Sequence, residues 1–310
     1  MTKVSTDTQP EVSIALCTYN GERFLREQLD SIINQQYLNI TEIVCVDDNS
    51  TDNTWSILQE YAAKHNAFRI FQNNANLGYI GNFEKALLLT TKSFIAIADQ
   101  DDVWYPTKII KLVQGIGNNL MIYSDNEFID KHGNSLGKRS SDFRNITSCR
   151  SCLSFSFFNV ISGHTILLSR ELLKYCIPFH PEIPHDLWIA FKASQYSEIP
   201  VVEEALVGYR QHDNNVFGAK GKQGQKGEET KRINLSHRRV QIYAENTAAH
   251  LKNEISVFEN LAKSYTDKSV KMRLKRIAIF WENRDALLLF KKRIKIRKMF
   301  YCLTVFWKYQ

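Results

Sequence analysis

Three aspartates at the end of an apolar segment give the strongest chemical signal in this chain. Residues 94–98 (FIAIA) are predicted to form a buried strand, and Asp99, Asp101 and Asp102 follow it directly. Carboxylates this close together repel one another and lose hydration unless a hard divalent cation lies among them. The spacing Asp-x-Asp therefore indicates a metal site that leaves coordination positions for a diphosphate. An acidic turn that caps the next helix, through Asp102 or Thr107, is the structural alternative.

The segments around these aspartates alternate between strand and helix patterns. Such alternation predicts a parallel sheet with helices on both faces, in which ligands bind beyond the carboxyl ends of the strands. Three strands end in polar sequence, at Thr18-Tyr19-Asn20-Gly21, Asp47-Asp48-Asn49-Ser50 and Asp99-Gln100-Asp101-Asp102, so these residues are expected to share one rim. Strands are expected over 12–17, 42–46, 69–72 and 94–98, and helices over 22–34, 53–65 (capped by Ser50 or Thr51) and 80–90.

The composition is that of an ordinary globular protein and excludes several classes. Of 310 residues, 44% are hydrophobic and 24% are charged. No apolar run approaches the roughly 18 residues of a membrane span, and the N-terminus lacks the pattern of a signal peptide. The six cysteines show no disulfide framework: Cys17 and Cys45 fall inside expected strands, and Cys149-x-x-Cys152 is a lone pair with only a weak case for a metal or redox role. A cytosolic location is therefore expected.

The positive charge is concentrated near the C-terminus. The chain holds 40 Lys/Arg and 33 Asp/Glu, and residues 269–310 hold 12 and 2 of these. Helices that alternate basic with apolar residues can lie on an anionic membrane. A helix packed on the rest of the chain with one basic solvated face is the alternative, and without a nucleic-acid-binding motif a nucleic-acid partner is not expected. The aromatic residues suited to a membrane interface are Trp281, Phe300, Tyr301, Phe306, Trp307 and Tyr309.

Seven segments occur together in an order that narrows the function. They are CTYNGERFLREQLDSIINQ, VDDNSTDNT, NLGYIGNFEKAL, ADQDDVWYPTK, SGHTILLSREL, PHDLWIA and YRQHDNNVFG. The combination resembles the family 2 glycosyltransferases of GT-A fold, and among them the bacterial rhamnosyltransferase-like enzymes that build surface polysaccharide such as O-antigen or capsule. The resemblance covers residues 11–218.

This resemblance implies a fold, a reaction and substrates. The expected fold is α/β of the GT-A type, Rossmann-like with a mostly parallel sheet flanked by helices, followed by a helical C-terminal extension. The reaction would be inverting, metal-dependent transfer of a sugar from a nucleoside diphosphate sugar (UDP- or dTDP-sugar) to a hydroxyl of a glycan or lipid-linked oligosaccharide. Mn²⁺ or Mg²⁺ would be the cofactor. The protein would be cytoplasmic and peripheral, bound to an anionic membrane surface at the cytoplasmic face.

The resemblance also assigns residues to the donor site. Tyr19 would stack on the nucleobase, with a surface tyrosine in a turn as the alternative. Asp48 matches the family residue that accepts the N3–H of the base, whereas Asp47 could cap the next helix. Asp99 is expected on the ribose or the metal. The nucleotide-binding set is Thr18, Tyr19, Asn20, Asp48, Asn76, Gly78, Asn82 and Asp99, of which Asn76, Gly78 and Asn82 could equally form a turn.

The catalytic base is expected in the segment Pro184-His185-Asp186-Leu187-Trp188. Asp186 matches the family carboxylate that removes the proton of the attacking hydroxyl, and an N-cap of the following helix is the alternative. The expected metal ligands are Asp99, Asp101 and His212, with Asp102 behind them and a structural His212 as the alternative. Arg210, Lys220 and Lys222 are candidates for phosphate contacts. Acceptor or supporting roles are expected for Gly163, His164, His185 and Trp188, where His185 could orient Asp186 and Trp188 could stack on sugar or fill the core.

The chain is expected to divide into four segments. These are an N-terminal tail over 1–10, the GT-A glycosyltransferase domain over 11–212, a glycine-rich mobile loop over 213–235 and a basic helical C-terminal extension over 236–310. A non-catalytic nucleotide-sugar-binding or scaffold protein of the same fold is the alternative function, but its expected loss of metal or base carboxylates is not seen. A dinucleotide-binding oxidoreductase needs a Gly-x-Gly-x-x-Gly turn after the first strand, where this chain has TYNGER.

Overall fold

The computed structural model describes residues 9–212, 237–267, 269–292, 298 and 300–304. The expected loop over 213–235, with Lys220 and Lys222, lies outside the described residues, as do residues 1–8 of the expected N-terminal tail. The strands are β1 (Val12–Thr18), β2 (Ile40–Asp47), β3 (Phe68–Gln72), β4 (Phe94–Ala98), β5 (Val103–Trp104), β6 (Met121–Ile129), β7 (Ser135–Arg139), β8 (Ile166–Ser169) and β9 (Val201–Arg210). The helices are α1 (Glu22–Ile33), α2 (Thr54–Lys64), α3 (Gly78–Leu89), α4 (Lys108–Ile116), α5 (Ser140–Phe143), α6 (Leu173–Cys176), α7 (His185–Ala193), α9 (Lys252–Thr266), α10 (Val270–Glu282) and α11 (Arg284–Leu287), with a further helical segment over 237–246.

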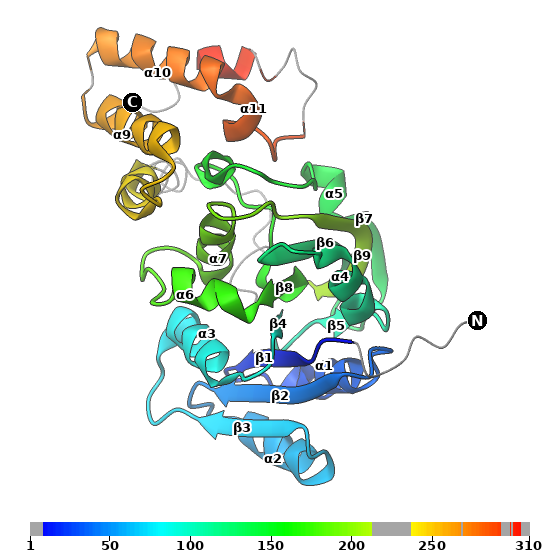
Figure 1. Cartoon of the computed structure of the whole chain (residues 1–310). Coiled ribbons are helices and arrows are strands. Elements are labelled where there is room, and N and C mark those ends of the chain that lie inside the picture. The colour runs from blue at the N-terminus through cyan, green and yellow to red at the C-terminus, as the bar shows by residue number, and fades with distance from the viewer. Residues whose placement is uncertain (1–8, 213–236, 268, 293–297, 299, 305–310) are drawn as a thin grey trace.

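The described strands form one nine-stranded sheet in the order β3-β2-β1-β4-β8-β6-β9-β5, with β7 beside β6 (Figure 1). Strands β3, β2, β1 and β4 run parallel, so their carboxyl ends lie at one edge of the sheet. Every strand and helix expected before residue 100 is present, and the bounds agree within two residues. The predicted α/β fold with a parallel sheet is therefore confirmed for this half of the chain.

The second half of the sheet is mixed in direction. Strand β8 runs antiparallel between β4 and β6, whereas β6 and β9 pair in parallel. The short strand β5 pairs antiparallel with β9, which returns the chain to the turn after β4. This arrangement places the end of β9 beside the aspartates at the end of β4.

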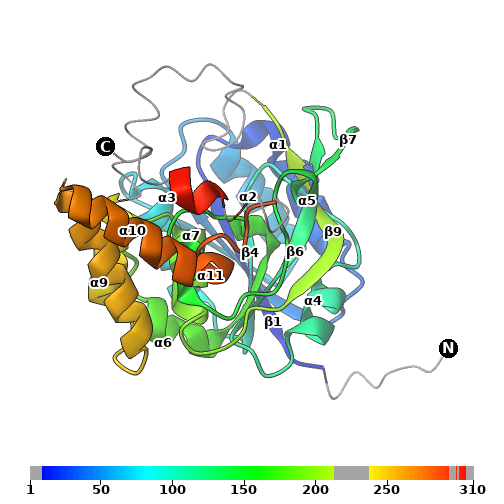
Figure 2. The same ribbon diagram turned by 90° about the horizontal axis from the view of Figure 1, so that it is seen from above.

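The sheet separates two hydrophobic cores because successive side chains on a strand point to opposite faces. In β1, Ile14 and Leu16 join the core that α1, α2 and α4 cover, and Ala15 and Cys17 join the other. The second core contains residues of α3 and α7 and continues into α9, α10 and α11. Figure 2 shows these C-terminal helices over the α7 side of the sheet.

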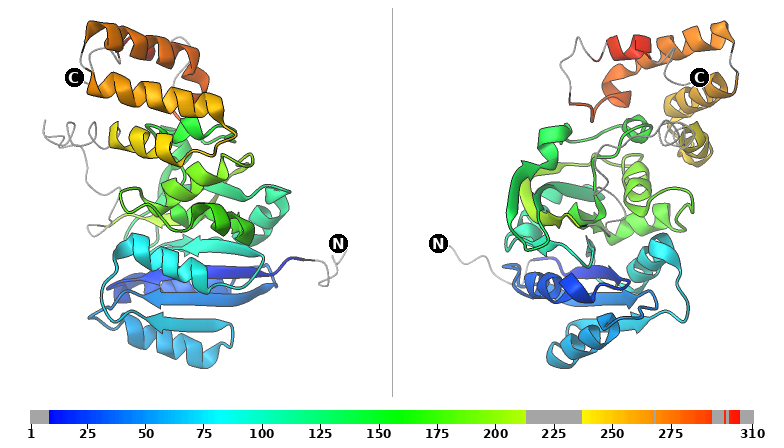
Figure 3. Two further views of the ribbon diagram at one scale, coloured as in Figure 1. Left: turned by 60° about the vertical axis from the view of Figure 1, so that its left-hand side comes forward. Right: turned by 180° about the vertical axis from the view of Figure 1, so that it is seen from behind.

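The C-terminal helices are tied to the body by buried aromatic and aliphatic side chains. Helices α9 and α10 lie side by side (Figure 3), and Phe280, Leu287 and Phe290 are fully buried in the core shared with α7. Tyr301 is also buried, at 6% exposure, so its predicted place at a membrane interface is wrong. Phe306, Trp307 and Tyr309 lie outside the described residues, and Trp281 and Phe300 are exposed. No helix formed by the described residues is both long and apolar enough to cross a membrane.

The helix starts differ from the sequence expectation in their caps. Ser50 and Thr51 do not cap α2: the hydroxyl of Ser50 donates to Asp47, and Asp52 accepts from the N–H of Thr54 at 3.0 Å. Thr107 is the N-cap residue of α4 but makes no side-chain capping bond. Asp47 does not cap a helix either. It holds the turn after β2, accepting from the hydroxyl of Thr18 and from the side chain of Gln72.

Candidate active site

A cavity of about 960 Å³ opens at the carboxyl ends of β1, β2 and β4. Residues between 159 and 164 and the first turn of α7 complete its wall. The structure brings the residues predicted for the nucleotide, the metal, the base and the acceptor to this cavity, except Trp188; of the predicted phosphate contacts, Arg210 does not line it, and Lys220 and Lys222 lie outside the described residues. The predicted residues that line it are Thr18, Tyr19, Asn20, Asp48, Asn76, Gly78, Asn82, Asp99, Asp101, Gly163, His164, His185, Asp186 and His212.

Asp48 lies at the β2 end of the cavity and is held by hydrogen bonds to its carboxylate. It is buried, and its Oδ1 accepts from Asn73 Nδ2 at 2.7 Å and from the backbone N–H of Leu77 at 2.8 Å. Asn82 supports this arrangement, because it accepts from Asn73 at 3.0 Å and donates to the carbonyl of Val46 at 2.9 Å. One carboxylate oxygen is thus fixed by the protein, and the side chain is presented to the cavity in a single orientation.

Asn20, Asn76 and Thr18 act on the loops as well as lining the cavity. Asn20 has a positive φ of 48° and accepts from the N–H of Thr51 at 2.8 Å, which joins the turns after β1 and β2. Asn76 accepts from the N–H of Gly78 at 2.9 Å, where a φ of +74° favours glycine. The predicted turn role of Asn76 and Gly78 is therefore present, and contact of these residues with a nucleotide stays a prediction.

The backbone of Tyr19 is held by hydrogen bonds to Gln100, and its side chain lines the cavity. Gln100 accepts from the N–H of Tyr19 at 2.8 Å and donates to its carbonyl at 3.0 Å, and the tyrosine is 48% exposed. A Cβ at Gly21 would lie 2.2 Å from Gln100 Oε1, so glycine is needed beside this bridge. Nothing in the sequence pattern singled out Gln100, because its partners lie 81 positions away.

Asp101 faces His212 across the rim of the cavity. His212 Nε2 lies 2.9 Å from Asp101 Oδ2, and the imidazole ring packs against Phe24 with centroids 4.9 Å apart. Both side chains line the cavity, one from the turn after β4 and the other just beyond β9. A carboxylate oxygen and an imidazole nitrogen held this close can share a divalent cation.

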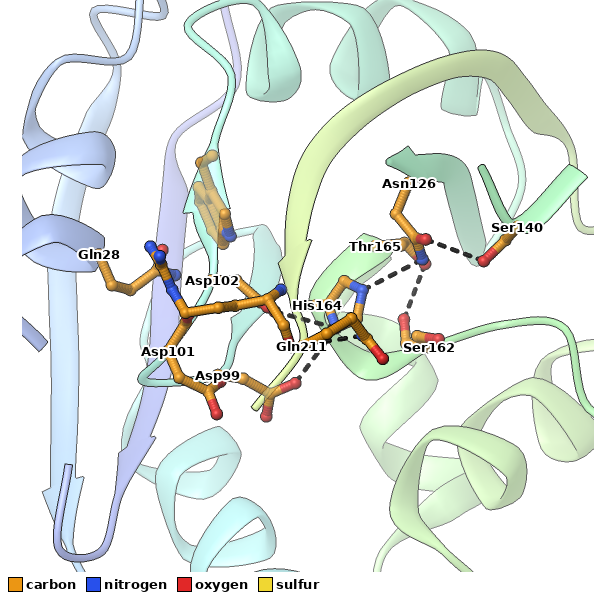
Figure 4. A network of polar contacts seen from close by, with 12 residues as sticks. Gln28, Asp99, Asp101, Asp102, Asn126, Ser140, Ser162, His164, Thr165 and Gln211 are labelled. Carbon is orange, nitrogen blue, oxygen red and sulfur yellow. Dashed lines mark hydrogen bonds and ion pairs between the residues drawn. The ribbon is translucent and has the colours of Figure 1, made fainter. Parts of the chain in front are cut away.

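Asp99, Asp102 and His164 form a second cluster beside Asp101, in the turn after β4 (Figure 4). His164 Nδ1 lies 3.3 Å from Asp99 Oδ2 and 3.1 Å from Asp102 Oδ2, while its Nε2 lies 3.2 Å from Asn126 Nδ2. Asn126 is in turn held by the hydroxyl of Ser140 at 2.8 Å. Burial, together with the negative charges of Asp101 and Asp99, raises the pKa of Asp102 to about 7 despite His164.

The members of the second cluster differ in their access to the cavity. Asp102 is fully buried and does not line it, whereas Asp99 and His164 do, as do Asp101 and His212. His164 was expected to contact the acceptor or to support the site; it lines the cavity and contacts Asp99 and Asp102, and its contact with an acceptor stays a prediction. The predicted position of Asp102 behind the metal ligands agrees with this arrangement. Among the described residues, the donor atoms of Asp99, Asp102 and His164 lie within 4.8 Å of one another, so this set also fits a divalent cation.

Arg210 is structural and does not reach the cavity. Its fully buried guanidinium donates to the carbonyl of Asp101 at 2.8 Å, to the carbonyl of Asp130 at 3.2 Å and to Glu27 at 2.6 Å. Its backbone N–H donates to Asp102 at 3.0 Å. The predicted phosphate contact of Arg210 is therefore wrong, because the guanidinium is buried and donates to Asp101, Asp130 and Glu27 instead.

Asp186 stands in the first turn of α7 and lines the opposite wall of the cavity. Its Oδ1 accepts from the N–H of Leu187 at 2.6 Å, and its Oδ2 lies 3.3 Å from Asn159 Nδ2. Pro184, not Asp186, is the N-cap residue, so the alternative of a simple N-cap does not hold. Burial raises the pKa of Asp186 above the ordinary range of aspartate. A carboxylate with a raised pKa at the wall of a cavity has the properties of a general base.

His185 and Gly163 fit each other closely beside Asp186. A Cβ at Gly163 would lie 2.8 Å from His185 Nε2, so the absence of a side chain at 163 gives this ring its place. His185 stacks on Phe83 with centroids 4.0 Å apart, and burial lowers its pKa. Trp188 points away from the cavity: it is 3% exposed and donates to the carbonyl of Cys176 at 2.8 Å. Of its two expected roles, filling the core is the one observed.

Several residues that line the cavity had no signal in the sequence. Asn159 contacts the carboxylate of Asp186, and Arg144 and Arg239 reach the cavity from segments that the motifs do not cover. These residues are brought in by long-range packing, and only a structure reveals their place.

Comparisons with known proteins place the chain among glycosyltransferases. The family model described as Glycosyl transferase family 2 matches residues 13–176. An uncharacterized glycosyltransferase of Haemophilus influenzae is 28% identical over 240 residues, which cover 74% of this chain and 74% of that protein. An uncharacterized glycosyltransferase of Rickettsia typhi is 31% identical over 216 residues, which cover 66% of this chain and 65% of that protein.

Solved structures share the fold at low sequence identity. S. aureus TarS in complex with UDP-GlcNAc superimposes with a TM-score of 0.60 and 18% identity, covering 89% of this chain and 81% of that chain. The mannosyltransferase PcManGT from Pyrobaculum calidifontis, in complex with GDP-Man and Mn²⁺, gives a TM-score of 0.54 and 20% identity, covering 96% and 86%.

Proposed function

The chain belongs to glycosyl transferase family 2 and is a glycosyltransferase of GT-A fold, and from this premise we propose its reaction. It transfers a sugar from a UDP- or dTDP-sugar to a hydroxyl of a glycan or lipid-linked oligosaccharide, with inversion at the anomeric carbon. The product belongs to a cell-surface polysaccharide, O-antigen or capsule. The observation that carries the proposal is that one cavity is lined by Asp48 and Tyr19, by the Asp101–His212 pair and by Asp186.

The donor nucleotide occupies the β1–β2 side of the cavity. Its base stacks on Tyr19 and gives its N–H to Asp48, whose other oxygen is already fixed by Asn73 and Leu77. Because uracil and thymine both carry this N–H, the proposal covers UDP- and dTDP-sugars alike. The GDP-Man complex of PcManGT shows that a protein of this fold also takes a guanine nucleotide, which makes the base an experimental question.

Asp101 and His212 are the proposed ligands of Mn²⁺ or Mg²⁺, with Asp99 at the edge of the same site. The 2.9 Å separation of Asp101 Oδ2 and His212 Nε2 supports this, since two such donors fit a hard or borderline cation. A bound cation would bridge the diphosphate and offset its developing charge. His164 contacts both Asp99 and Asp102 and so orients the Asp99 carboxylate. Arg210 donates to the carbonyl of Asp101 and fixes the backbone there.

Asp186 is the proposed general base. The acceptor hydroxyl approaches the anomeric carbon from the α7 side, and Asp186 takes its proton as the new bond forms. Asn159 and the N–H of Leu187 hold the carboxylate in place. Inversion follows from a single in-line displacement, which needs one base and no covalent enzyme intermediate.

A thermal-shift screen tests the donor half of this proposal. We expect a UDP- or dTDP-sugar to raise the unfolding temperature with Mn²⁺ and to raise it far less with EDTA, because the diphosphate and the carboxylates repel without a cation. UDP, dTDP and GDP sugars are compared, with AMP as a control for non-specific nucleotide binding. Equal shifts with Mn²⁺ and with EDTA would remove the metal from the proposal.

The exposed face of α10 supports contact with an anionic membrane. Val270, Leu274 and Trp281 are exposed and lie on one face of this helix, because spacings of four and seven residues return to nearly the same side. Lys271 and Arg273 lie on the two sides of this face, at about 80° from its centre. An apolar stripe bordered by basic residues suits the headgroup region of anionic lipid.

Vesicle sedimentation tests this surface. We expect the full chain to sediment with anionic vesicles at low salt and to be released at high salt, because the attraction of basic residues is screened. Leu274→Ser with Trp281→Ser is expected to weaken sedimentation, and the matched exposed pair Leu38→Ser with Leu88→Ser is not. Removing residues 269–310 is not a clean test, since Phe280 and Phe290 belong to the core. Equal sedimentation of both double variants would assign this face to another role.

A further inference from the structure

Two arginines reach the cavity from the half of the chain that carries Asp186, and the nucleotide proposal uses neither. Arg144 follows α5, and Arg239 lies in the helical segment 237–246. Building on the proposed transfer reaction, we propose that Arg144 and Arg239 form a subsite for a phosphate group of the acceptor. The acceptor of this enzyme is then an anionic phosphoester that carries the reactive hydroxyl nearby.

The packing of segment 237–246 against α7 locates Arg239. Arg238 pairs with Glu182, just before α7, at 2.8 Å, and Tyr243 stacks on Phe191 of α7 with centroids 3.7 Å apart. At the other end, Lys192 donates to the carbonyl of Asn246 at 2.8 Å. The segment therefore runs alongside α7 with its beginning near the first turn of that helix. Arg239 enters the cavity at the same end of α7 as Asp186.

Arg144 reaches the cavity from a different wall. The preceding Phe143 packs on Phe128 at 6.0 Å, and Phe128 packs on Tyr209 at 5.9 Å. Tyr209 lines the cavity and lies 4.7 Å from His164. The following Asn145 is bonded through its backbone N–H to the carbonyl of Phe290 at 3.1 Å, which fixes this stretch to the C-terminal helices.

Arg144 and Arg239 lack ion-pair partners among the described residues, which favours an anionic ligand. In the described part of the chain, Arg238 pairs with Glu182 and Arg210 with Glu27, and neither lines the cavity. Arg23 in α1 lines the cavity on the nucleotide side and has no ion pair among the described residues. Arg144 and Arg239 have no carboxylate within 4.0 Å among the described residues, and Arg239 Nε is buried without a hydrogen-bond partner. A guanidinium with unsatisfied donors recognises phosphate oxygens by strong charge-assisted bonds.

The position of the arginines favours the acceptor over the donor. The nucleotide half of the cavity is built by residues at the ends of β1, β2 and β4, whereas both arginines belong to segments after residue 140. Two acceptor types share the required chemistry, a sugar linked to a prenyl diphosphate and a phosphorylated polyol. In both, the phosphate would anchor the molecule while a hydroxyl reaches Asp186.

Calorimetric titration of the full chain, saturated with UDP and Mn²⁺, tests the subsite. The probes are geranyl diphosphate and glycerol 3-phosphate, with geraniol and glycerol as their uncharged counterparts. We expect at least one anionic probe to bind about tenfold or more tighter than its counterpart, as one charge-assisted hydrogen bond allows. The probe that binds tells which of the two acceptor types the subsite serves.

The variants assign this affinity to the arginines. Arg144→Gln and Arg239→Gln are each expected to weaken the anionic probe about tenfold, while Arg239→Lys retains part of the affinity because the charge remains. Arg238→Gln is the matched control, since it lies next to Arg239 but pairs with Glu182 outside the cavity. Thermal unfolding of each variant confirms that it is folded.

Three results would overturn the subsite. They are no preference of the wild type for either anionic probe, unchanged probe affinity in both glutamine variants, and a loss of UDP affinity as large as the loss of probe affinity. The last would assign the arginines to the donor diphosphate. Failure of the proposed function itself gives a different result, because the wild type would then bind neither UDP nor dTDP in the presence of Mn²⁺.

Discussion

Replacing Asp186 by asparagine is expected to lower turnover by at least about 100-fold, the usual loss when a general base is removed. Asparagine keeps the shape of the side chain, and its one oxygen can still accept from the N–H of Leu187, while its NH₂ group replaces the oxygen that accepts from Asn159. Donor affinity should change little, because Asp186 belongs to α7, whereas the residues proposed to bind the base, Tyr19 and Asp48, follow β1 and β2. The measurement is steady-state release of the nucleoside diphosphate, with donor binding followed separately.

The pH profile separates this role from a structural one. Burial raises the pKa of Asp186, so a larger share of the wild-type enzyme is protonated at mildly acidic pH than for an ordinary aspartate. Turnover should therefore fall as the pH drops through this raised pKa, and the residual turnover of Asp186→Asn should lack that acid limb. Asp285→Asn, at an exposed position in α11 outside the cavity, is the matched control. Near-wild-type turnover in Asp186→Asn would exclude Asp186 as the base.

Asp101→Ala is expected to abolish metal-dependent nucleotide binding. The substitution removes one of two proposed cation ligands and leaves His212 without its partner 2.9 Å away. The diphosphate then has no cation to offset the remaining carboxylates, so the affinity gained on adding Mn²⁺ should disappear. Nucleotide titrations with Mn²⁺ and with EDTA measure this difference directly.

Asp102→Ala provides an informative comparison in the same turn. Asp102 is fully buried against His164 and the N–H of Arg210, so its loss should lower stability and weaken metal-dependent binding less than Asp101→Ala does. Asp285→Ala controls for removal of an exposed carboxylate. A full Mn²⁺ response in Asp101→Ala would move the cation to the cluster of Asp99, Asp102 and His164.

The parallel half of the sheet could be predicted from the sequence because its signals are local. Each strand of β1, β2 and β4 is an apolar run that ends in polar residues, and parallel pairing brings those ends together whatever the rest of the chain does. The gathering of Asp48, Asp99 and Asp101 at one rim followed from this rule alone. Asp186 and His212 were placed by family resemblance, which extends over the less regular half.

The remaining parts depend on contacts that no local pattern encodes. The antiparallel entry of β8 between β4 and β6 brings His164 under the aspartates, 65 positions after Asp99. From the sequence, Arg210 was expected to contact phosphate because it is basic and lies close to His212. The structure shows that its guanidinium instead bonds Glu27 and two backbone carbonyls in the interior. The basic tail was ambiguous because α10 has two apolar faces, one in the core and one exposed.

The buried guanidinium of Arg210 also orders events during synthesis of the chain. The turn of Asp101 and Asp102 receives the hydrogen bonds of Arg210 from the end of β9, more than 100 positions later. His212 follows two residues after Arg210, so the same late strand brings the partner of Asp101. A nascent chain that ends before β9 already contains His164, which contacts Asp99 and Asp102, but lacks Arg210 and the histidine partner of Asp101. We therefore expect the chain to bind the sugar donor only after β9 and His212 have been synthesised.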